Sequence, residues 1–271
     1  MPIKLRFLGA AQNVTGSKYL LEANDTRILV DCGLYQERDF KSRNWEAFPF
    51  EPGTLDAVLL THAHIDHCGL LPKLVRDGFR GNIYCTTATS EITGIMLLDS
   101  AKLQQEDAEF KKRRHQKENR QGPFPEIPLY TVEDARSTIP MLSAVEYKET
   151  IPIGNGITAS FHEAGHVLGS SMIKIVVRQE KEERTIVFSG DIGTRNKPIL
   201  RDRATFDEAD YVIVESTYGD RLHENPVDIG NALADTIIAA REAGGNIIVP
   251  SFALERTQEI LYYLNDLLIE H

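Results

Sequence analysis

Three histidines and an aspartate fall within six consecutive positions of the chain, at His62, His64, Asp66 and His67. Ordinary core packing gives no reason for so many metal-binding side chains to lie this close together. Imidazole and carboxylate are ligands that zinc prefers, and catalytic zinc sites keep one position open for water. The cluster therefore predicts a metallohydrolase. The alternative is a set of surface histidines at the start of a helix.

The spacing within this cluster favours two metal ions over one. His62 and His64 are two residues apart, so both project to the same side where the chain is extended. Asp66 and His67 follow in a turn and can face a second ion. Because all four side chains would crowd a single ion, a dinuclear centre is the better interpretation.

The elements around the cluster place it at the edge of a sheet. An apolar run at 56–60 is typical of a strand buried on both faces, and a short helix is expected over 70–75. The cluster therefore occupies the loop that leads from the carboxyl end of a strand into a helix. Ligands commonly bind at this position in α/β proteins.

A second candidate ligand follows a predicted strand at 158–162. His166 lies among small residues in a turn, where the chain can approach an ion closely. His162, at the end of the strand itself, is more typical of a core histidine or of a group that supports a ligand.

Two aspartates also follow predicted strands. Asp191 comes after the strand 185–188, where its carboxylate could bridge two ions or cap a turn. Asp31 ends the strand 27–30, where it could hold a ligand imidazole or a loop amide, or simply belong to a turn.

The rest of the first 200 residues predicts strands and helices in a mixed α/β pattern. Strands are expected at 4–8, 18–22 and 82–85, and helices at 89–110 and 132–142. Thr131 and Asp134 have the spacing of a capping box at the start of the second helix.

After residue 205 the pattern changes to alternating strands and helices. Strands are expected at 211–214 and 246–249, one helix begins at Asn225-Pro226, and another covers 254–268. We therefore predict a first domain over 1–207 and the start of a second over 208–271.

The composition excludes some classes of protein and restricts others. The formal net charge is −10, so nucleic acid could bind only through a local positive patch or a bound metal. One such patch is 109–120, with six Lys or Arg against two Glu, which could bind phosphates or be a solvated helix end.

No apolar run approaches the roughly 18 residues of a membrane span. Three cysteines leave one unpaired, which indicates a reduced cytoplasm.

The order of these residues along the chain resembles the metallo-β-lactamase superfamily. The elements of the resemblance are Asp31, the His-x-His-x-Asp-His cluster, His166 and Asp191. Two further stretches, 215–221 and 249–259, are similar to the β-CASP branch of RNA-processing nucleases, as are the segments 9–17 and 165–170.

The resemblance implies an α/β fold, an αββα metallo-β-lactamase sandwich followed by the start of a β-CASP domain with a βαβα pattern. It also implies two zinc ions. One would be bound by His62, His64 and His166, the other by Asp66 and His67. Asp191 would bridge the two ions, and Asp31 would support the cluster.

The activity implied is hydrolysis of RNA phosphodiester bonds by a hydroxide that two zinc ions hold. Asp66 would also accept or orient its proton, and Glu215 matches the acidic residue that begins the β-CASP insert and orients a catalytic histidine. Ser251, at a helix N-terminus, and Arg256 are candidate phosphate contacts, although Arg256 could instead form a helix-cap ion pair. RNA is the expected partner and a membrane is not. A homodimer is one assembly that would fit.

The match departs from the family after residue 260, where the only remaining histidine is His271. Family members continue with the rest of the insert and a return segment that carries two more histidines. We therefore expect that this chain is truncated, that its second zinc is bound weakly and that it cleaves poorly. Two other functions stay open: a hydrolase of small thioesters or esters resembling glyoxalase II, and a non-catalytic RNA-binding subunit.

Overall fold

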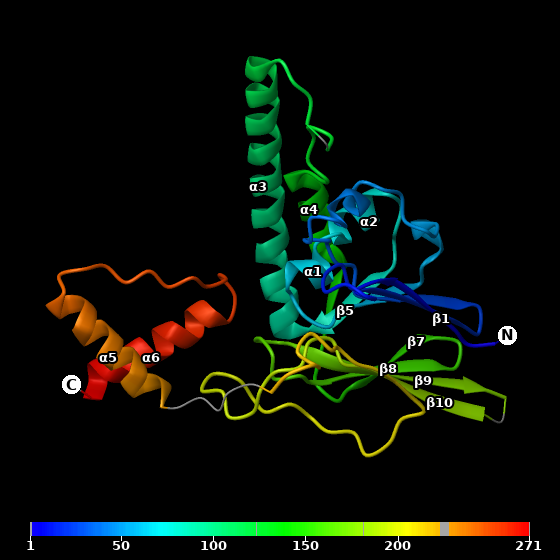
Figure 1. Ribbon diagram of the computed structural model, residues 1–271. Coiled ribbons are helices and arrows are strands. Elements are labelled where there is room, and N and C mark those ends of the chain that lie inside the picture. The colour runs from blue at the N-terminus through cyan, green and yellow to red at the C-terminus, as the bar shows by residue number, and fades with distance from the viewer. Residues whose placement is uncertain (1, 123, 181, 223–227, 271) are drawn as a thin grey trace.

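Apolar strands within the first 213 residues pair into two sheets (Figure 1). The computed structural model describes residues 2–122, 124–180, 182–222 and 228–270. The first sheet has six strands in the order of the sequence: β1 (Lys4–Gly9), β2 (Lys18–Ala23), β3 (Thr26–Val30), β4 (Ala57–Leu59), β5 (Asn82–Thr86) and β6 (Leu142–Val145). The second has five strands in the order β11 (Tyr211–Ile213), β10 (Glu182–Phe188), β9 (Ser171–Gln179), β8 (Ile157–Glu163) and β7 (Thr150–Gly154).

Each sheet contains both parallel and antiparallel strand pairs. Strands β1 to β3 are antiparallel, and the β2–β3 turn places Asn24 and Asp25 at φ 49° and 60°, which these residue types tolerate well. Strands β3 to β6 are parallel and largely buried. In the second sheet only the β10–β11 pair is parallel.

Two apolar cores hold these layers together. One fills the space between the two sheets, with Val30, Phe161 and Phe188 among its buried residues. The other lies between the first sheet and its helices and contains Leu71 and Tyr130. Strands such as β3, apolar on both faces, contribute to both cores, which fits their near-continuous apolar sequence.

Four helices accompany the first sheet: α1 (Ile65–Cys68), α2 (Leu71–Arg76), α3 (Thr87–Glu118) and α4 (Val132–Thr138). Short 3-10 turns cover Lys41–Asn44, Pro52–Thr54 and Ile139–Met141. The predicted capping box at the start of α4 is confirmed, since the Thr131 hydroxyl accepts from the Asp134 amide and the Asp134 carboxylate accepts from the Thr131 amide. The predicted α/β sandwich is confirmed by these layers, although none of the described helices packs extensively on the five-stranded sheet.

The structure differs from the expected elements in three places. The helix expected over 132–142 ends at Thr138, because Pro140 has no N–H with which to continue it, and residues 142–145 instead pair with β5 as strand β6. Strand β7 was not expected from the sequence. Helix α3 is longer than expected at both ends, with Thr86 as its N-cap and Asn119 in the left-handed conformation at its C-terminus.

The last part of the chain forms two helices that pack against each other, α5 (Ile229–Glu242) and α6 (Arg256–Glu270), and they lie to one side of the sheets (Figure 1). The predicted helix start at Asn225-Pro226 lies outside the described residues. The strand expected over 246–249 is wrong: these residues are exposed, Ile248 to 88%, and pair with no described strand. The domain boundary at residue 207 stays a prediction.

The core between the sheets should dominate the stability of this fold. Phe161 is fully buried there, so Phe161→Ala should lower the free energy of unfolding by about 3–5 kcal/mol. Phe110→Ala removes the same atoms from a side chain that is 59% exposed and should change the free energy by less than about 0.5 kcal/mol. Denaturant unfolding of both variants measures the difference. Equal losses would show that the sheets do not depend on this core.

Candidate metal centre

The candidate metal ligands follow the carboxyl ends of strands from both sheets. Asp31 follows β3, the His62 cluster follows β4, His166 follows β8 and Asp191 follows β10. Because the two sheets face each other, four strand ends that are distant in sequence meet at one edge of the sandwich. The fold therefore holds these side chains at the carboxyl ends of strands, where the sequence places them.

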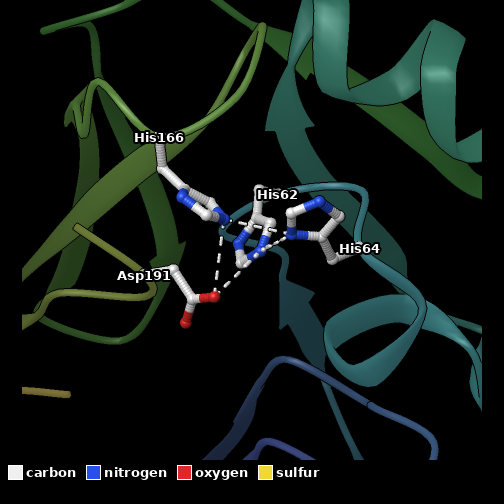
Figure 2. Close-up of side chains that lie close together, drawn as sticks. All are labelled: His62, His64, His166 and Asp191. Atoms are coloured by element: carbon white, nitrogen blue, oxygen red, sulfur yellow. Dashed lines mark hydrogen bonds and ion pairs between the residues drawn. The ribbon is translucent and has the colours of Figure 1, made fainter. Parts of the chain in front are cut away.

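Four side chains converge on one point and form the first ligand set: His62, His64, His166 and Asp191 (Figure 2). Each offers one ligand atom, and these atoms all lie within 4.8 Å of one another. His64 Nδ1 is 3.1 Å from Nε2 of both His62 and His166. Asp191 Oδ2 is 3.8 Å from His62 Nε2 and 3.5 Å from His166 Nε2.

The electrostatics of the first ligand set favour a bound cation. Burial lowers the pKa of His62 and His64, and it lowers the pKa of His166 to about 4. At neutral pH these imidazoles are therefore uncharged, which is the form that binds metal. Uncharged nitrogens that face one another present lone pairs to a common point, and a metal ion at that point would remove the repulsion between them.

A second ligand set lies on the other side of the Asp191 carboxylate. Asp191 Oδ1 is 3.2 Å from His67 Nε2, and Asp66 Oδ2 is 3.9 Å from the same nitrogen. Asp191 thus turns one oxygen toward each ligand set, the arrangement that a carboxylate bridging two ions requires. The first set therefore fits a metal ion with four protein ligands. The second brings three further candidate ligand groups together, Asp66, His67 and the other oxygen of Asp191.

The buried carboxylate of Asp31 orients histidines of both sets. It accepts hydrogen bonds from His67 Nδ1 at 2.7 Å, the Thr61 amide at 2.8 Å, the Thr61 hydroxyl at 3.0 Å and the Ser17 hydroxyl at 3.1 Å. Since the Thr61 proton points at Asp31, the Thr61 oxygen accepts from His62 Nδ1 at 3.0 Å. Both His62 and His67 are therefore held with Nε2 free to face the metal position.

The charges around His67 make its position attractive to a cation. Burial by itself would lower the pKa of His67, but the carboxylates of Asp31 and Asp191 raise it well above its usual range. Burial would likewise raise the pKa of Asp191, and the neighbouring His67, His62 and His166 lower it well below its usual range. A divalent ion bound beside His67 would replace the imidazolium proton as the partner of these carboxylates.

Two glycines let the loops approach as closely as the ligands require. A Cβ on Gly33 would lie 1.5 Å from the Asp66 carbonyl oxygen, and a Cβ on Gly193 would lie 1.5 Å from the Gly165 carbonyl oxygen. The first glycine therefore allows the loop after β3 to pass beside the His62 cluster. The second allows the Asp191 loop to pass beside the His166 loop.

An open cleft of about 340 Å³ runs beside the second ligand set. His67 and Asp191 form part of its wall, together with Glu215 and the loop that includes Gln12 and Asn13. The Glu215 carboxylate accepts hydrogen bonds from the Ile192 amide at 3.1 Å and the Thr217 amide at 3.3 Å. Glu215 thus fastens the loop that carries Asp191 to the chain after β11.

A family model for the metallo-beta-lactamase superfamily matches residues 14–232, well over half of the chain. This chain belongs to the metallo-β-lactamase superfamily. The match covers both ligand sets and every strand of the two sheets except β1, so the fold and the superfamily that the motifs predict are confirmed.

Curated relatives carry names from RNA metabolism. Ribonuclease TTHA0252 of Thermus thermophilus is 39% identical over 256 residues, which are 94% of this chain and 53% of the relative. RNase aCSPSF2 of Saccharolobus solfataricus is 31% identical and matches 96% of this chain and 48% of the relative. Transcription termination factor FttA of Methanocaldococcus jannaschii is 30% identical, with 97% and 39% matched. The chain thus spans about half the length of these relatives or less. Their names confirm the predicted similarity to β-CASP RNA-processing nucleases.

Some predicted site residues of this metallo-β-lactamase chain lie apart from the metal centre. His162 bonds to the Ser160 hydroxyl and stacks edge-on against Phe206, as expected of a packed histidine. Ser251 pairs with Thr257, and Arg256 forms an ion pair with Glu259, the alternative that the sequence left open. Neither Ser251 nor Arg256 lines the cleft beside the metal centre as described, so their contact with phosphate stays a prediction.

Two supporting residues of the metallo-β-lactamase site were missed from the sequence. Thr61 links Asp31 to His62, and its carbonyl accepts from the amide and hydroxyl of Ser171 in the second sheet. Glu37 accepts hydrogen bonds from the Thr15 hydroxyl and from the amides of Thr15 and Val14, which anchors the loop along the cleft. Burial would raise the pKa of Glu37, but these hydrogen bonds lower it to about 2. The position of Thr61 between a strand and the cluster was the available signal, whereas Glu37 stands in no motif.

Asp31→Asn should weaken metal binding without removing any ligand. The amide cannot accept all four hydrogen bonds, so His67 and Thr61 lose their fixed orientation. Loss of such a supporting group typically lowers metal affinity about 10- to 100-fold. Titration of the metal-free protein with zinc, followed by calorimetry, measures the change. Asp99→Asn, at an exposed position with no described partner, is the control and should bind zinc as the wild type does.

Metal should stabilise the folded chain through the first ligand set. Zinc at about 100 times its dissociation constant should add about 2.7 kcal/mol, which corresponds to a rise in Tm of about 5–10 °C. His166→Gln should abolish most of this rise because it removes one of the four ligands. His162→Gln should retain the rise, since that ring lies outside the ligand sets. An equal rise in both variants would contradict the ligand assignment.

Proposed function

We propose that this protein is a zinc-dependent ribonuclease that hydrolyses RNA phosphodiester bonds at a dinuclear centre. The observation that carries the proposal is the Asp191 carboxylate, which turns one oxygen toward each ligand set at the wall of an open cleft. Relatives named as ribonucleases support RNA as the substrate. Because the chain spans about half the length of these relatives, the proposal concerns the natural full-length protein.

In this proposal His62, His64 and His166 bind the first zinc, Asp66 and His67 bind the second, and Asp191 bridges them. A bound zinc pair lowers the pKa of water and stabilises negative charge on phosphoryl oxygens. Asp31 keeps the ligand nitrogens aimed at the two positions through His67 and Thr61.

Asp66 also has the position of a proton acceptor. Its carboxylate is one-fifth exposed and lies 3.9 Å from His67, which lines the cleft. In the proposed reaction it orients the attacking water and takes its proton.

Glu215 acts indirectly, by positioning another residue, and does not touch the reacting atoms. It holds the amide of Ile192, the residue after Asp191, and so it fixes the bridging carboxylate from the side of β11. The family resemblance adds a second role, in which Glu215 orients a catalytic histidine. Ser251 and Arg256 complete the proposal as contacts for phosphate at the start of α6.

Two broader parts of the proposal concern location and assembly. The free cysteines Cys32, Cys68 and Cys85 are all buried, which fits a reduced cytoplasmic compartment. No helix in the described part of the chain is long and apolar enough to cross a membrane. A homodimer is included as a prediction that a sedimentation measurement would test.

Asp66→Asn in the natural full-length protein should lower the rate of RNA cleavage by about 10²- to 10⁴-fold, because it removes the proton acceptor and one zinc ligand. The assay follows a labelled RNA, with zinc content measured on the same samples. Asp99→Asn is the matched control and should cleave as the wild type does. If the wild type binds about two zinc ions, leaves RNA intact and hydrolyses thioesters, the ribonuclease proposal is wrong and the small-ester alternative replaces it.

A further inference from the structure

Helix α3 extends far beyond the layers that it helps to cover (Figure 1). It has 32 residues, and its N-terminal end lies against the His166 loop, where the hydroxyls of Thr86 and Thr89 both donate to the Gly169 carbonyl. At about 1.5 Å per residue, the distance from Thr87 to Arg113 is about 40 Å. One end of the helix therefore touches the metal loop, and the other end, residues 109–120, forms what we call the α3 tip.

The α3 tip is strongly basic in a chain whose net charge is −10. Part of this charge is neutralised, since Lys111 pairs with Asp107 and Glu118 pairs with Arg114 and Arg120. Lys112, Arg113 and Lys117 are exposed and form no ion pair with any residue that the structure describes. The tip thus presents three unpaired cations and one exposed acid, Glu109, to solvent.

An aromatic ring stands among these charges. Phe110, Arg113, Arg114 and Lys117 have the spacing i, i+3, i+4 and i+7, so they form one stripe along the helix. The opposite side carries Ala108 and His115, which are buried, so the stripe faces solvent. Phe110 is 59% exposed there. Phe110 lies between Glu106 and Asp107 on its N-terminal side and Arg113 and Arg114 on its C-terminal side. An exposed aromatic side chain beside cations matches the chemistry of a single-stranded nucleic acid, whose bases stack and whose phosphates pair with cations.

The α3 tip is held in place by the chain that returns from it. His115 Nδ1 and Glu126 Oε1 are 2.5 Å apart, and Gly122 lies against the His115 ring. Phe124 stacks on Trp45 with the ring centroids 5.3 Å apart, which ties the returning segment to the body of the protein. The positive stripe is therefore presented on a braced arm.

Stabilisation of the helix itself does not explain this charge. Cations near a helix C-terminus interact favourably with the helix dipole, but the effect falls off within the last turn. That turn contains Lys117, whereas Lys112, Arg113 and the exposed Phe110 precede it. The helix dipole therefore does not explain why Lys112, Arg113 and Phe110 are exposed at these positions.

We propose that the α3 tip is a second contact for the RNA strand that is cleaved at the metal centre, and this inference rests on the proposed function. Between the two ends, exposed Asp99 and Glu106 lie on the same side of α3 as the stripe and outnumber the one exposed cation near them, Lys102, so the shaft offers a polyanion no net attraction. The strand therefore contacts the protein at the cleft and again at the tip. At 3.4 Å per stacked nucleotide, about a dozen nucleotides separate the two contacts.

The test compares two RNA lengths in the natural full-length protein with zinc bound. The tip variant is Lys112→Gln, Arg113→Gln and Lys117→Gln combined. The control is Lys4→Gln, Lys41→Gln and Lys148→Gln combined, which removes the same charge from exposed lysines that lie outside α3 and have no described ion pair. Unstructured RNAs of about 6 and about 24 nucleotides lie below and above the required span. The tip variant should lose on the order of tenfold in kcat/KM on the long RNA only, and the slope of log affinity against log salt should fall by about 2.

The outcomes test the contact at the α3 tip separately from the activity of the metal centre. Equal behaviour of tip variant and control on the long RNA, or an equal loss on both lengths, would overturn the proposed contact. If the wild type cleaves neither RNA, the ribonuclease proposal fails instead. Fluorescence anisotropy on the uncleaved RNAs then decides separately whether the α3 tip binds a long strand. Unchanged Tm values in both variants verify that the fold is intact.

Discussion

The metal centre depends on one buried carboxylate, that of Asp31. This side chain is 1% exposed, and an isolated charge at such a position would be strongly unfavourable. Four hydrogen bonds from Thr61, Ser17 and His67 offset this cost, and each of them also positions a segment of the site. Asp31 itself adopts φ 57°, a left-handed conformation that costs free energy and that the surrounding bonds maintain. The orientation of the ligands is therefore a consequence of satisfying one buried charge.

The same network connects the two sheets. The Thr61 carbonyl accepts from Ser171 in β9, and a Cβ on Gly190 would lie 2.8 Å from Thr61 Cβ, so the Asp191 loop passes directly over this residue. Ligands from β4, β8 and β10 can meet only while the core between the sheets keeps its spacing. Metal binding and sheet packing are thus coupled, because a shift of one sheet against the other would separate the ligand sets.

The charge of the chain is distributed in a way that suits a polyanionic substrate. A net charge of −10 would repel RNA as a whole, so attraction has to come from local features. In the proposed function a zinc pair beside the cleft would provide one such feature, and the α3 tip would provide another. The shaft of α3 between them offers a polyanion no net attraction. Specificity for a long strand can then arise from spacing, without base-specific contacts.

Much of this site could be predicted from the chain. The predictable features are local patterns, which can be identified in the sequence directly. They are the spacing of histidines and aspartates, the apolar runs before each candidate ligand and the capping box at Thr131. Features that depend on distant partners were not predictable in the same way. Thr61 shows its role only once Asp31 and Ser171 are beside it. Strand β6 forms because β5 offers a free edge, and the apolar run 246–249 stays exposed because no described strand lies next to it.

The sequence by itself therefore determined which groups could bind metal and which elements would carry them, since both follow from side-chain chemistry and periodicity. Only the tertiary structure decided that Asp191 turns one oxygen to each ligand set, that His64 offers Nδ1 while His62 and His166 offer Nε2, and that α3 runs from the metal loop to a basic tip. The physical reason is that such orientations are set by packing between residues far apart in the chain, where burial and hydrogen bonding select one arrangement from many that the sequence alone allows.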